Sequence, residues 1–379
     1  MRALEFYSGI GGLHLALTRA CPTAKVIRAF DWDQTACRVY EANHGSGVAQ
    51  KTDISTLTAD SLAKEYGQVD IWLLSPACQP YTVLNPNAQG AEDPRAQSYL
   101  HLLRNVLPGL EERGCLPGYV LVENVAGFEG STTRQLQLEV LKELGYHIQE
   151  LLLTPLQFGI PNSRLRYYML ARRGKDFSRP GLGSSSGDGP RGEEEGVSVL
   201  DQGDEEEYRV LRHIPGQPAE WREEDVEELR GYLDEETSLE ESNEFAVSDK
   251  VLSKWGRLFD IVLPSGRRSC CFTRGYTHLV ERSGSILQMA EDLDTTQTFD
   301  KFLQETREGN ADAVKILYPL RLRYFSPSEL LRIFAFEGKG GDGQGFVWPT
   351  GVSTKSKYKL IGNSVNVRVV EELIRYLLS

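Results

Sequence analysis

The segment ALEFYSGIGG, residues 3–12, decides the fold of this chain. It opens with the apolar and aromatic run ALEFY, which is typical of a buried strand, and a helix-length stretch at 11–20 follows. Glycines at a strand-to-helix turn let a ligand approach the backbone, and the helix N-terminus favours an anionic group. The segment therefore predicts a ligand-binding turn in an α/β protein, with a plain tight turn as the alternative.

Similar apolar runs recur along the first half of the chain, separated by helix-length stretches. We expect strands at 3–7, 26–30, 69–75, 119–125, 148–153 and 166–171, and helices at 11–20, 33–43, 97–113 and 133–144. Continuous apolar strands separated by helices indicate a mostly parallel sheet that is covered on both faces. The expected fold class is α/β with a doubly wound sheet, whose site residues follow the carboxyl ends of the strands.

The composition excludes several classes of protein. Of the 379 residues, 40% are hydrophobic and 25% are charged, as in an ordinary soluble protein. No apolar run approaches the ~18 residues of a membrane span, and the N-terminus is neither a signal peptide nor a basic transit peptide. Six cysteines without a CxxC pair argue against a disulfide framework and a zinc ribbon. We expect no membrane partner, no metal, and a cytoplasmic and also nuclear location.

The net charge of −12 argues, taken alone, against a nucleic-acid partner, but it is unevenly spread. Residues 188–244 hold 21 acidic and 5 basic residues, a net charge of −16, which leaves 37 basic and 33 acidic residues, or +4, elsewhere. The low-complexity stretch at 179–196 predicts a disordered acidic insert at about 176–207. We interpret it as a solvated loop; the alternative is a tail that screens off wrong polyanions. An acidic helix is compatible with 220–241.

Two acidic residues extend the predicted ligand site: Asp31 after the strand at 26–30, and Asp53 after a further candidate strand that precedes the one at 69–75. His14 stands where a GxGxxG motif has its third glycine, which argues against a dinucleotide. Asp31 lies 22 positions after Gly9, where a carboxylate would bind a ribose diol, and Asp53 could contact an adenine amino group. These features favour a nucleoside cofactor with a carboxylate in place of phosphates, and S-adenosylmethionine fits that description.

Three further segments carry reactive side chains. Cys78 lies on the proline-flanked loop SPACQP, where a thiolate could be stabilised, although a buried core cysteine is the alternative. Glu123 follows the apolar run YVLV and is either a paired structural charge or a site group. Arg164 and Arg166 alternate onto one face of a strand and suit an anion, unless that strand lies at a solvated edge. We interpret the other cysteines as structural: Cys21, Cys37, Cys115, Cys270 and Cys271.

Taken in order, these motifs resemble those of the cytosine-5 methyltransferases. FYSGIGG, SPACQP, ENV, RLR and the late GNSVNVRVV match from residue 3 to about 175 and again from about 320 to 379. The stretch Cys271-Phe272-Thr273, with RLRYFSPSEL after it, resembles the branch of that family that modifies tRNA. The resemblance implies methylation of carbon 5 of a cytosine by S-adenosyl-L-methionine, which leaves S-adenosyl-L-homocysteine. The branch implies cytosine 38 of the tRNA-Asp anticodon loop.

The resemblance also implies a role for each site residue. Cys78 adds to carbon 6 of the base, Glu123 contacts ring nitrogen 3 and the exocyclic amine, and Arg166, supported by Arg164, steadies the carbonyl oxygen. The implied cofactor-binding residues are Phe6, Ser8, Gly9, Ile10, Gly11, Gly12, Asp31, Trp32, Asp53, Ile54, Ser75, Pro76, Asn363, Ser364 and Val365.

The resemblance further implies a division of the chain. Residues 1–175 form the first part of a catalytic domain of the Rossmann-like methyltransferase type, 176–320 a small inserted target-recognition region, and 321–379 the returning part. RSCCFTRGY suits a strand that bears on RNA, or a local structural turn. We expect a monomer that binds tRNA in a salt-sensitive way and DNA weakly. The arginines that an RNA would meet are Arg164, Arg166, Arg267, Arg268 and Arg274.

One residue departs from the family pattern. The family usually has proline immediately before the reactive cysteine, and Ala77 stands there in this chain. Losing the proline ring loosens the loop and could slow attack by the thiol. Two alternative functions therefore stay open, a DNA cytosine-5 methyltransferase and a catalytically silent homologue that binds tRNA or the cofactor.

Overall fold

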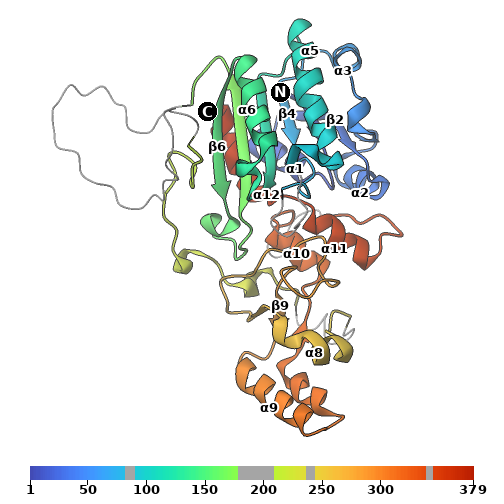
Figure 1. Cartoon of the computed structure of the whole chain (residues 1–379), viewed down its shortest axis with the longest axis vertical. Coiled ribbons are helices and arrows are strands. Elements are labelled where there is room, and N and C mark those ends of the chain that lie inside the picture. The colour runs from blue at the N-terminus through green and yellow to red at the C-terminus, as the bar shows by residue number, and fades with distance from the viewer. Residues whose placement is uncertain (82–89, 178–208, 236–243, 339–344) are drawn as a thin grey trace, which may run out of the picture.

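The computed structural model describes residues 1–81, 90–177, 209–235, 244–338 and 345–379. An α/β body holds both termini, and a smaller part built from the orange and yellow segments extends away from it (Figure 1). The body is organised around a seven-stranded sheet with the strand order β3-β2-β1-β4-β5-β7-β6. The body combines two segments that are far apart in sequence. Its last helix, α12 (Val367–Leu378), packs against α1 (Gly12–Ala20) near the start of the chain.

Six of the seven strands of the large sheet follow the predicted apolar runs, and the short, partly exposed β3 is not one of those runs. The strands are β1 (Arg2–Phe6), β2 (Lys25–Asp31), β3 (Ala49–Lys51), β4 (Ile71–Leu74), β5 (Tyr119–Val125), β6 (Tyr146–Leu153) and β7 (Arg166–Arg173). All neighbouring pairs are parallel except those of β7, which runs antiparallel to both β5 and β6. All four side chains of β4 are buried, as expected of a strand covered on both faces. The prediction of a mostly parallel α/β sheet is confirmed.

Helices cover both faces of this sheet. One hydrophobic cluster packs α1, α2 (Gln34–His44) and α12 against it, and the other packs α3 (Ala59–Tyr66), α4 (Gln97–His101), α5 (Leu107–Glu112) and α6 (Thr132–Glu143). The helix predicted at 97–113 is interrupted by a π-helical turn at Leu102–Val106. Pro108 in the first turn of α5 has no N–H for the i−4 carbonyl, so the regular ladder cannot continue there.

The smaller part has its own sheet and core. Its strands are β8 (Ile261–Val262), β9 (Ile286–Gln288) and β10 (Leu322–Arg323), and its helices are α8 (Asp249–Trp255) and α9 (Thr295–Arg307). The chain then returns to the body through α10 (Pro327–Ile333) and α11 (Thr354–Gly362). The division into domains at residues 175 and 320 stays a prediction; in the structure, β10 pairs antiparallel with β9.

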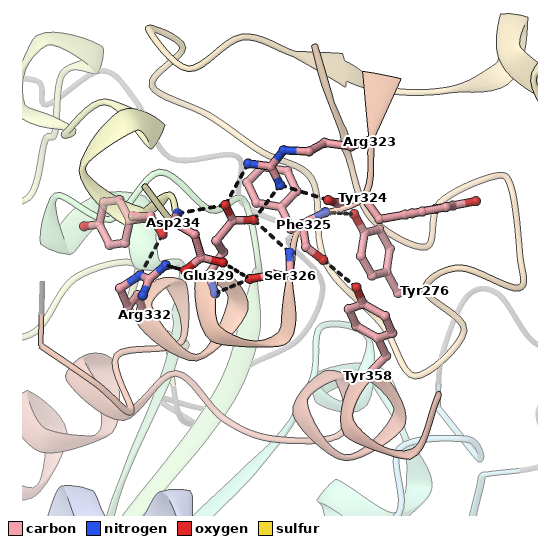
Figure 2. A network of polar contacts seen from close by, with 10 residues as sticks. Asp234, Tyr276, Arg323, Tyr324, Phe325, Ser326, Glu329, Arg332 and Tyr358 are labelled. Carbon is pink, nitrogen blue, oxygen red and sulfur yellow. Dashed lines mark hydrogen bonds and ion pairs between the residues drawn. The ribbon is translucent and has the colours of Figure 1, made fainter. Parts of the chain in front are cut away.

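A buried carboxylate joins the smaller part to the body. Glu329 of α10 accepts both terminal nitrogens of Arg323, at 2.7 and 2.8 Å, and the N–H of Asp234 at 2.9 Å (Figure 2). Beside it, the N–H of Phe325 donates to the hydroxyl of Tyr276 at 2.9 Å. Because the Glu329 side chain is fully buried, each of these partners offsets the cost of removing its charge from water. The network therefore ties β10 of the smaller part to α10 and to the segment that holds Asp234.

The acidic region differs from the prediction at its two described ends. Residue 177 does not belong to a loose insert, because Phe177 is 6% exposed and lies between Tyr376 and Arg172. The rest of the predicted insert, 178–207, lies outside the described residues.

The acidic helix at 220–241 is wrong for its described part. That part has only short turns, at Glu223–Asp225 and Leu229–Tyr232, and 236–243 lie outside the described residues. The N–H groups of Leu229 and Arg230 donate to the carbonyls of Gly266 and Pro264, so they are not available for an α-helical ladder. In the described ranges, no helix is both long and apolar enough to cross a membrane.

Candidate active site

A cavity of about 230 Å³ lies where β1, β2, β4 and β5 end, the position expected for a site in a sheet of this kind. It gathers nine of the predicted site residues. Its lining residues are Tyr7, Gly9, Asp31, Asp33, Ala36, Ser75, Pro76, Ala77, Cys78, Gln79, Glu123, Val125, Arg164, Arg166, Leu360, Gly362 and Asn363. Tyr7 and Gln79 belong to the motifs FYSGIGG and SPACQP but were not predicted as site residues. Asp33 and Leu360 were not predicted because nothing in their local sequence distinguishes them from ordinary loop or helix residues.

The glycine loop borders one side of the cavity. Gly9 and Gly11 have φ values of +53° and +85°, which a residue with a side chain rarely adopts. The N–H of Gly9 donates to Asp31 Oδ2 at 2.8 Å, so the loop is tied to the end of β2. A Cβ on Gly12 would lie 2.8 Å from Val365 Cγ2, which shows how closely the late motif packs on the loop.

The residues around the loop fit a nucleoside cofactor. Ser8 does not line the cavity, but its Oγ is buried on the glycine loop beside it, without a hydrogen-bond partner among the described residues. A Cβ built on Gly9 meets nothing within 4 Å, so there is open space beside the backbone. Burial raises the pKa of Asp31, against the lowering effect of the N–H groups of Asp33 and Gly9. Asp31 lines the cavity, so its carboxyl can accept hydrogen bonds from ligand hydroxyl groups.

Other predicted cofactor residues do not line this cavity. Phe6, Ile10, Ile54 and Val365 are buried in the hydrophobic core, and Gly11, Gly12 and Ser364 pack beside it. Trp32 is 67% exposed, with the ammonium of Lys51 5.5 Å from its ring. Asp53 is exposed and accepts hydrogen bonds from Ser55, which lower the pKa of Asp53. The cofactor roles of these residues stay predictions.

Cys78 lies on the loop that follows β4. The N–H of Tyr81 donates to its carbonyl at 3.0 Å, and Asn124 Nδ2 donates to the carbonyl of Pro76 at 3.3 Å, so the loop is held at two points. Burial raises the pKa of the Cys78 thiol, and the nearby Arg166 offsets only part of this rise. The thiol is therefore protonated in the resting protein at neutral pH.

The reactivity of Cys78 should rise with pH throughout the neutral range. Because only the thiolate is nucleophilic, alkylation by iodoacetamide should speed up about tenfold per pH unit between about pH 6 and pH 9. The rate would be read by mass spectrometry of the peptide that holds Cys78, with the partly exposed Cys115 as an internal comparison. A rate that levels off below about pH 8 would show that the surrounding cations outweigh burial.

Glu123 lies at the end of β5 and faces both the loop and the arginines. Its Oε2 accepts the hydroxyl of Ser75 at 2.6 Å, and its Oε1 lies 3.5 Å from Arg166 Nε. The side chain is only 6% exposed, so these contacts compensate for its burial. The sequence left two interpretations of Glu123 open, a paired charge and a site group. In the structure, Glu123 is paired with Arg166 and also lines the cavity, and its catalytic role stays a prediction.

The two arginines of the RLR motif differ in what they contact. Arg164 is 3% exposed and donates to the carbonyls of Phe272 at 2.8 Å, Ser364 at 2.6 Å and Gly362 at 3.2 Å. It thus joins the Cys-Phe-Thr stretch to the late motif, and its guanidinium is not a surface contact for RNA. Arg166 keeps one side towards Glu123.

Arg267 is also less available to RNA than predicted. It donates to the carbonyl of Val226 and pairs with Glu228 at 3.2 Å, so its charge is already partly neutralised. Arg268 and Arg274 are exposed.

A second thiol lies beside the arginine pair. Cys271 Sγ is 3.3 Å from Arg164 Nη1 and 3.5 Å from Arg166 Nη2. Burial acts to raise its pKa, but the two guanidinium groups outweigh burial and lower the pKa of Cys271. Sequence reasoning missed this contact because more than 100 residues separate the thiol from its partners. Among the described residues, no group of three or more His, Cys, Asp or Glu side chains is placed to hold a metal ion.

The doubly wound sheet, the glycine loop and the Cys78 pocket together define an S-adenosylmethionine-dependent methyltransferase. The family model of the C-5 cytosine-specific DNA methylases matches residues 1–379. The chain belongs to this family.

Individual relatives match over the full length of the chain. A tRNA (cytosine(38)-C(5))-methyltransferase of Schizosaccharomyces pombe is 38% identical over 100% of this chain and 97% of its own length. A DNA (cytosine-5)-methyltransferase of Dictyostelium discoideum is 33% identical over 100% of this chain and 94% of its own. The crystal structure of the S. pombe Dnmt2 methyltransferase superposes with a TM-score of 0.74, at 37% identity, and the match covers 100% of this chain and 98% of that one.

Proposed function

We propose that this chain transfers the methyl group of S-adenosyl-L-methionine to carbon 5 of a cytosine in tRNA, at cytosine 38 of the tRNA-Asp anticodon loop. The observation that carries the proposal is the convergence of Cys78, Glu123 and Arg166 in one cavity beside the glycine loop. The similarity over the full length to a tRNA (cytosine(38)-C(5))-methyltransferase supports the choice of substrate. We further propose that the protein acts as a monomer in the cytoplasm and also in the nucleus.

In the proposed mechanism, Cys78 makes the base reactive. Carbon 5 of cytosine is a poor nucleophile, and addition of the Cys78 thiolate to carbon 6 converts the ring into an enamine that is nucleophilic at carbon 5. After methylation, the proton on carbon 5 leaves to water, the electron pair re-forms the ring double bond, and the thiolate is expelled. Cys78 therefore ends the cycle unchanged.

Glu123 and Arg166 stabilise the charge that this addition creates. Electron density moves towards ring nitrogen 3 and the carbonyl oxygen as the thiolate adds. Glu123 would donate a proton to nitrogen 3 and accept from the exocyclic amine, while Ser75 holds its carboxyl in place at 2.6 Å. Arg166, held 3.5 Å from Glu123, would bind the carbonyl oxygen.

The cofactor supplies an electrophilic methyl group, and the chain's own residues would orient it. Asp31 would accept the ribose hydroxyls, and the backbone at Gly9 leaves room for the ligand to approach. Ser8 Oγ would donate to a polar group of the ligand and would thereby gain the hydrogen-bond partner that it lacks among the described residues. S-adenosyl-L-homocysteine is then the product, and no metal takes part in the proposed reaction.

An anticodon loop is a suitable substrate for such a buried pocket. The target base must leave its stack to reach Cys78, and extrusion costs less from a hairpin loop than from a duplex. Arg274 belongs to the Cys-Phe-Thr segment, and its charge acts on the Cys78 thiol, so it lies near the pocket. As an exposed cation, it is the residue that we expect to meet the RNA backbone.

Labelled methyl transfer should distinguish tRNA from DNA. We expect S-adenosylmethionine to label tRNA-Asp at least about a hundredfold faster, in kcat/KM, than duplex DNA that contains cytosine. Bisulfite sequencing of the product should report conversion only at cytosine 38. Duplex DNA is included as a second substrate in this assay because the Dictyostelium relative is named a DNA (cytosine-5)-methyltransferase. A preference for DNA would overturn the tRNA assignment and leave the family chemistry intact.

A further inference from the structure

Four buried polar side chains form a chain of contacts below the glycine loop. Glu5, in the middle of β1, accepts the hydroxyl of Tyr40 from α2 at 2.7 Å, and this hydroxyl also lies 2.7 Å from Nδ1 of His14 on α1. The His14 ring stacks on that of His44, at the end of α2, with 4.3 Å between the ring centres. None of the four side chains lines the cavity that holds Cys78.

This chain of contacts ends directly against the backbone of the loop. A Cβ on Gly11 would lie 2.2 Å from His44 Nε2 and 3.1 Å from Tyr40 Cδ2, so both rings press on the backbone at that glycine. The backbone of Ile10 also forms a hydrogen bond with His44. The rings of His44 and Tyr40 therefore support the loop conformation, which has a φ of +85° at Gly11.

The network is uncharged at neutral pH. Burial raises the pKa of Glu5 to about 8, against the lowering effect of the Tyr40 hydroxyl. Burial also lowers the pKa of His14 to about 3 and that of His44 to about 4. Besides the Tyr40 hydroxyl, Glu5 contacts the backbone N–H of His14, and His44 contacts the backbone of Ile10. Burying polar side chains costs more than burying apolar ones, so a purely structural core would not need these four, and they require another explanation.

We propose that Glu5, Tyr40, His14 and His44 are positioning residues that hold the loop Ser8–Gly12 in the shape that binds the cofactor. The Tyr40 hydroxyl holds the His14 ring through Nδ1, and the His14 ring holds the His44 ring by stacking. The His44 ring in turn packs against the backbone at Gly11 and holds it in place. The inference concerns cofactor binding by the chain alone and does not depend on which nucleic acid is methylated.

Tyr40→Phe tests the proposal because it removes only the hydroxyl that joins Glu5 to His14. We expect the Kd for S-adenosylmethionine, measured by calorimetry without nucleic acid, to rise about tenfold. The KM for the cofactor should rise with it, while kcat at saturating cofactor stays within about twofold. The single variant Glu5→Gln keeps Tyr40 and an acceptor for its hydroxyl, so its Kd for the cofactor should stay close to that of the wild type.

Tyr99→Phe is the matched control. The Tyr99 hydroxyl is equally buried and donates to Gln137 at 2.5 Å, but it belongs to the cluster on the opposite face of the sheet. It should lower the melting temperature about as much as Tyr40→Phe without changing the cofactor Kd. The proposal would be overturned if the wild type, Tyr40→Phe and Tyr99→Phe had equal Kd values for the cofactor, or if Tyr40→Phe and Tyr99→Phe weakened its binding equally. Should Tyr40→Phe not fold, His14→Phe keeps the stacked ring, removes Nδ1 and should weaken binding similarly.

Discussion

Cys78→Ala is expected to lower methyl transfer to tRNA by at least about 10³-fold, because no other described residue that lines the cavity has a thiol to make carbon 5 of the base nucleophilic. The side chain loses only its sulfur, and the contacts that hold the loop are made by the backbone of Cys78 and by Pro76. Binding of S-adenosylmethionine and of tRNA should therefore stay within about twofold. Initial rates of labelled methyl transfer and equilibrium binding would measure the two effects separately.

Cys21→Ser is the control for the loss of a thiol. Cys21 follows the last residue of α1 and does not line the cavity, and its Sγ lies 3.6 Å from the hydroxyl of Thr23, so its replacement should leave the rate unchanged. A second measurement tests the adduct directly. A tRNA with 5-fluorocytosine at the target position cannot lose its carbon 5 substituent, so wild-type protein should form a stable covalent complex and Cys78→Ala none.

The same complex decides whether the chain is a silent homologue. Ala77 replaces the family's proline, but the loop is still held through Pro76 and Cys78. If wild-type protein forms no complex with the fluorinated tRNA and Ala77→Pro does, the wild-type chain binds without turnover. A complex with the wild-type chain would show that the Cys78 thiol adds to the base with alanine at position 77.

The sequence predicted the fold well because its strands are short, continuous and apolar. Each predicted run became a strand of the large sheet, since a fully buried strand such as Ile71–Leu74 needs apolar residues on both faces. The π-helical turn before Pro108 was missed because one residue's missing N–H changed the ladder within an otherwise regular helical pattern.

Contacts between distant segments could not be predicted in the same way. Nothing near Arg164 indicates that its guanidinium would bind the carbonyls of Phe272 and Ser364, because both partners are main-chain groups over 100 residues away. Cys271 was interpreted as structural for the same reason, and the lowered pKa of its thiol depends on Arg164 and Arg166. Motif order could indicate which residues belong to the site, but not what each one contacts.

Glu123→Gln should lower kcat by about 10² to 10³-fold with little change in the KM for the cofactor. Gln keeps the shape of the side chain and can still accept the Ser75 hydroxyl, now 2.6 Å away. It cannot donate a proton to ring nitrogen 3, and its amide N–H groups would face Arg166 in place of a carboxylate oxygen. The addition step therefore loses both its acid and the partner that orients the arginine.

Glu129→Gln provides the matched comparison, because this carboxylate lies near the end of β5 and accepts the N–H of Gly127 at 2.7 Å without lining the cavity. The amide oxygen of the new Gln side chain can still accept the N–H of Gly127, so the methyl-transfer rate of this variant should match that of the wild type. The trap with fluorinated tRNA then separates two explanations for Glu123→Gln. If Glu123 assists addition, the covalent complex should form more slowly by the same factor as kcat. If the complex forms at the wild-type rate while turnover falls, Glu123 acts after the thiolate has added, and the protonation that we assign to it belongs to another group.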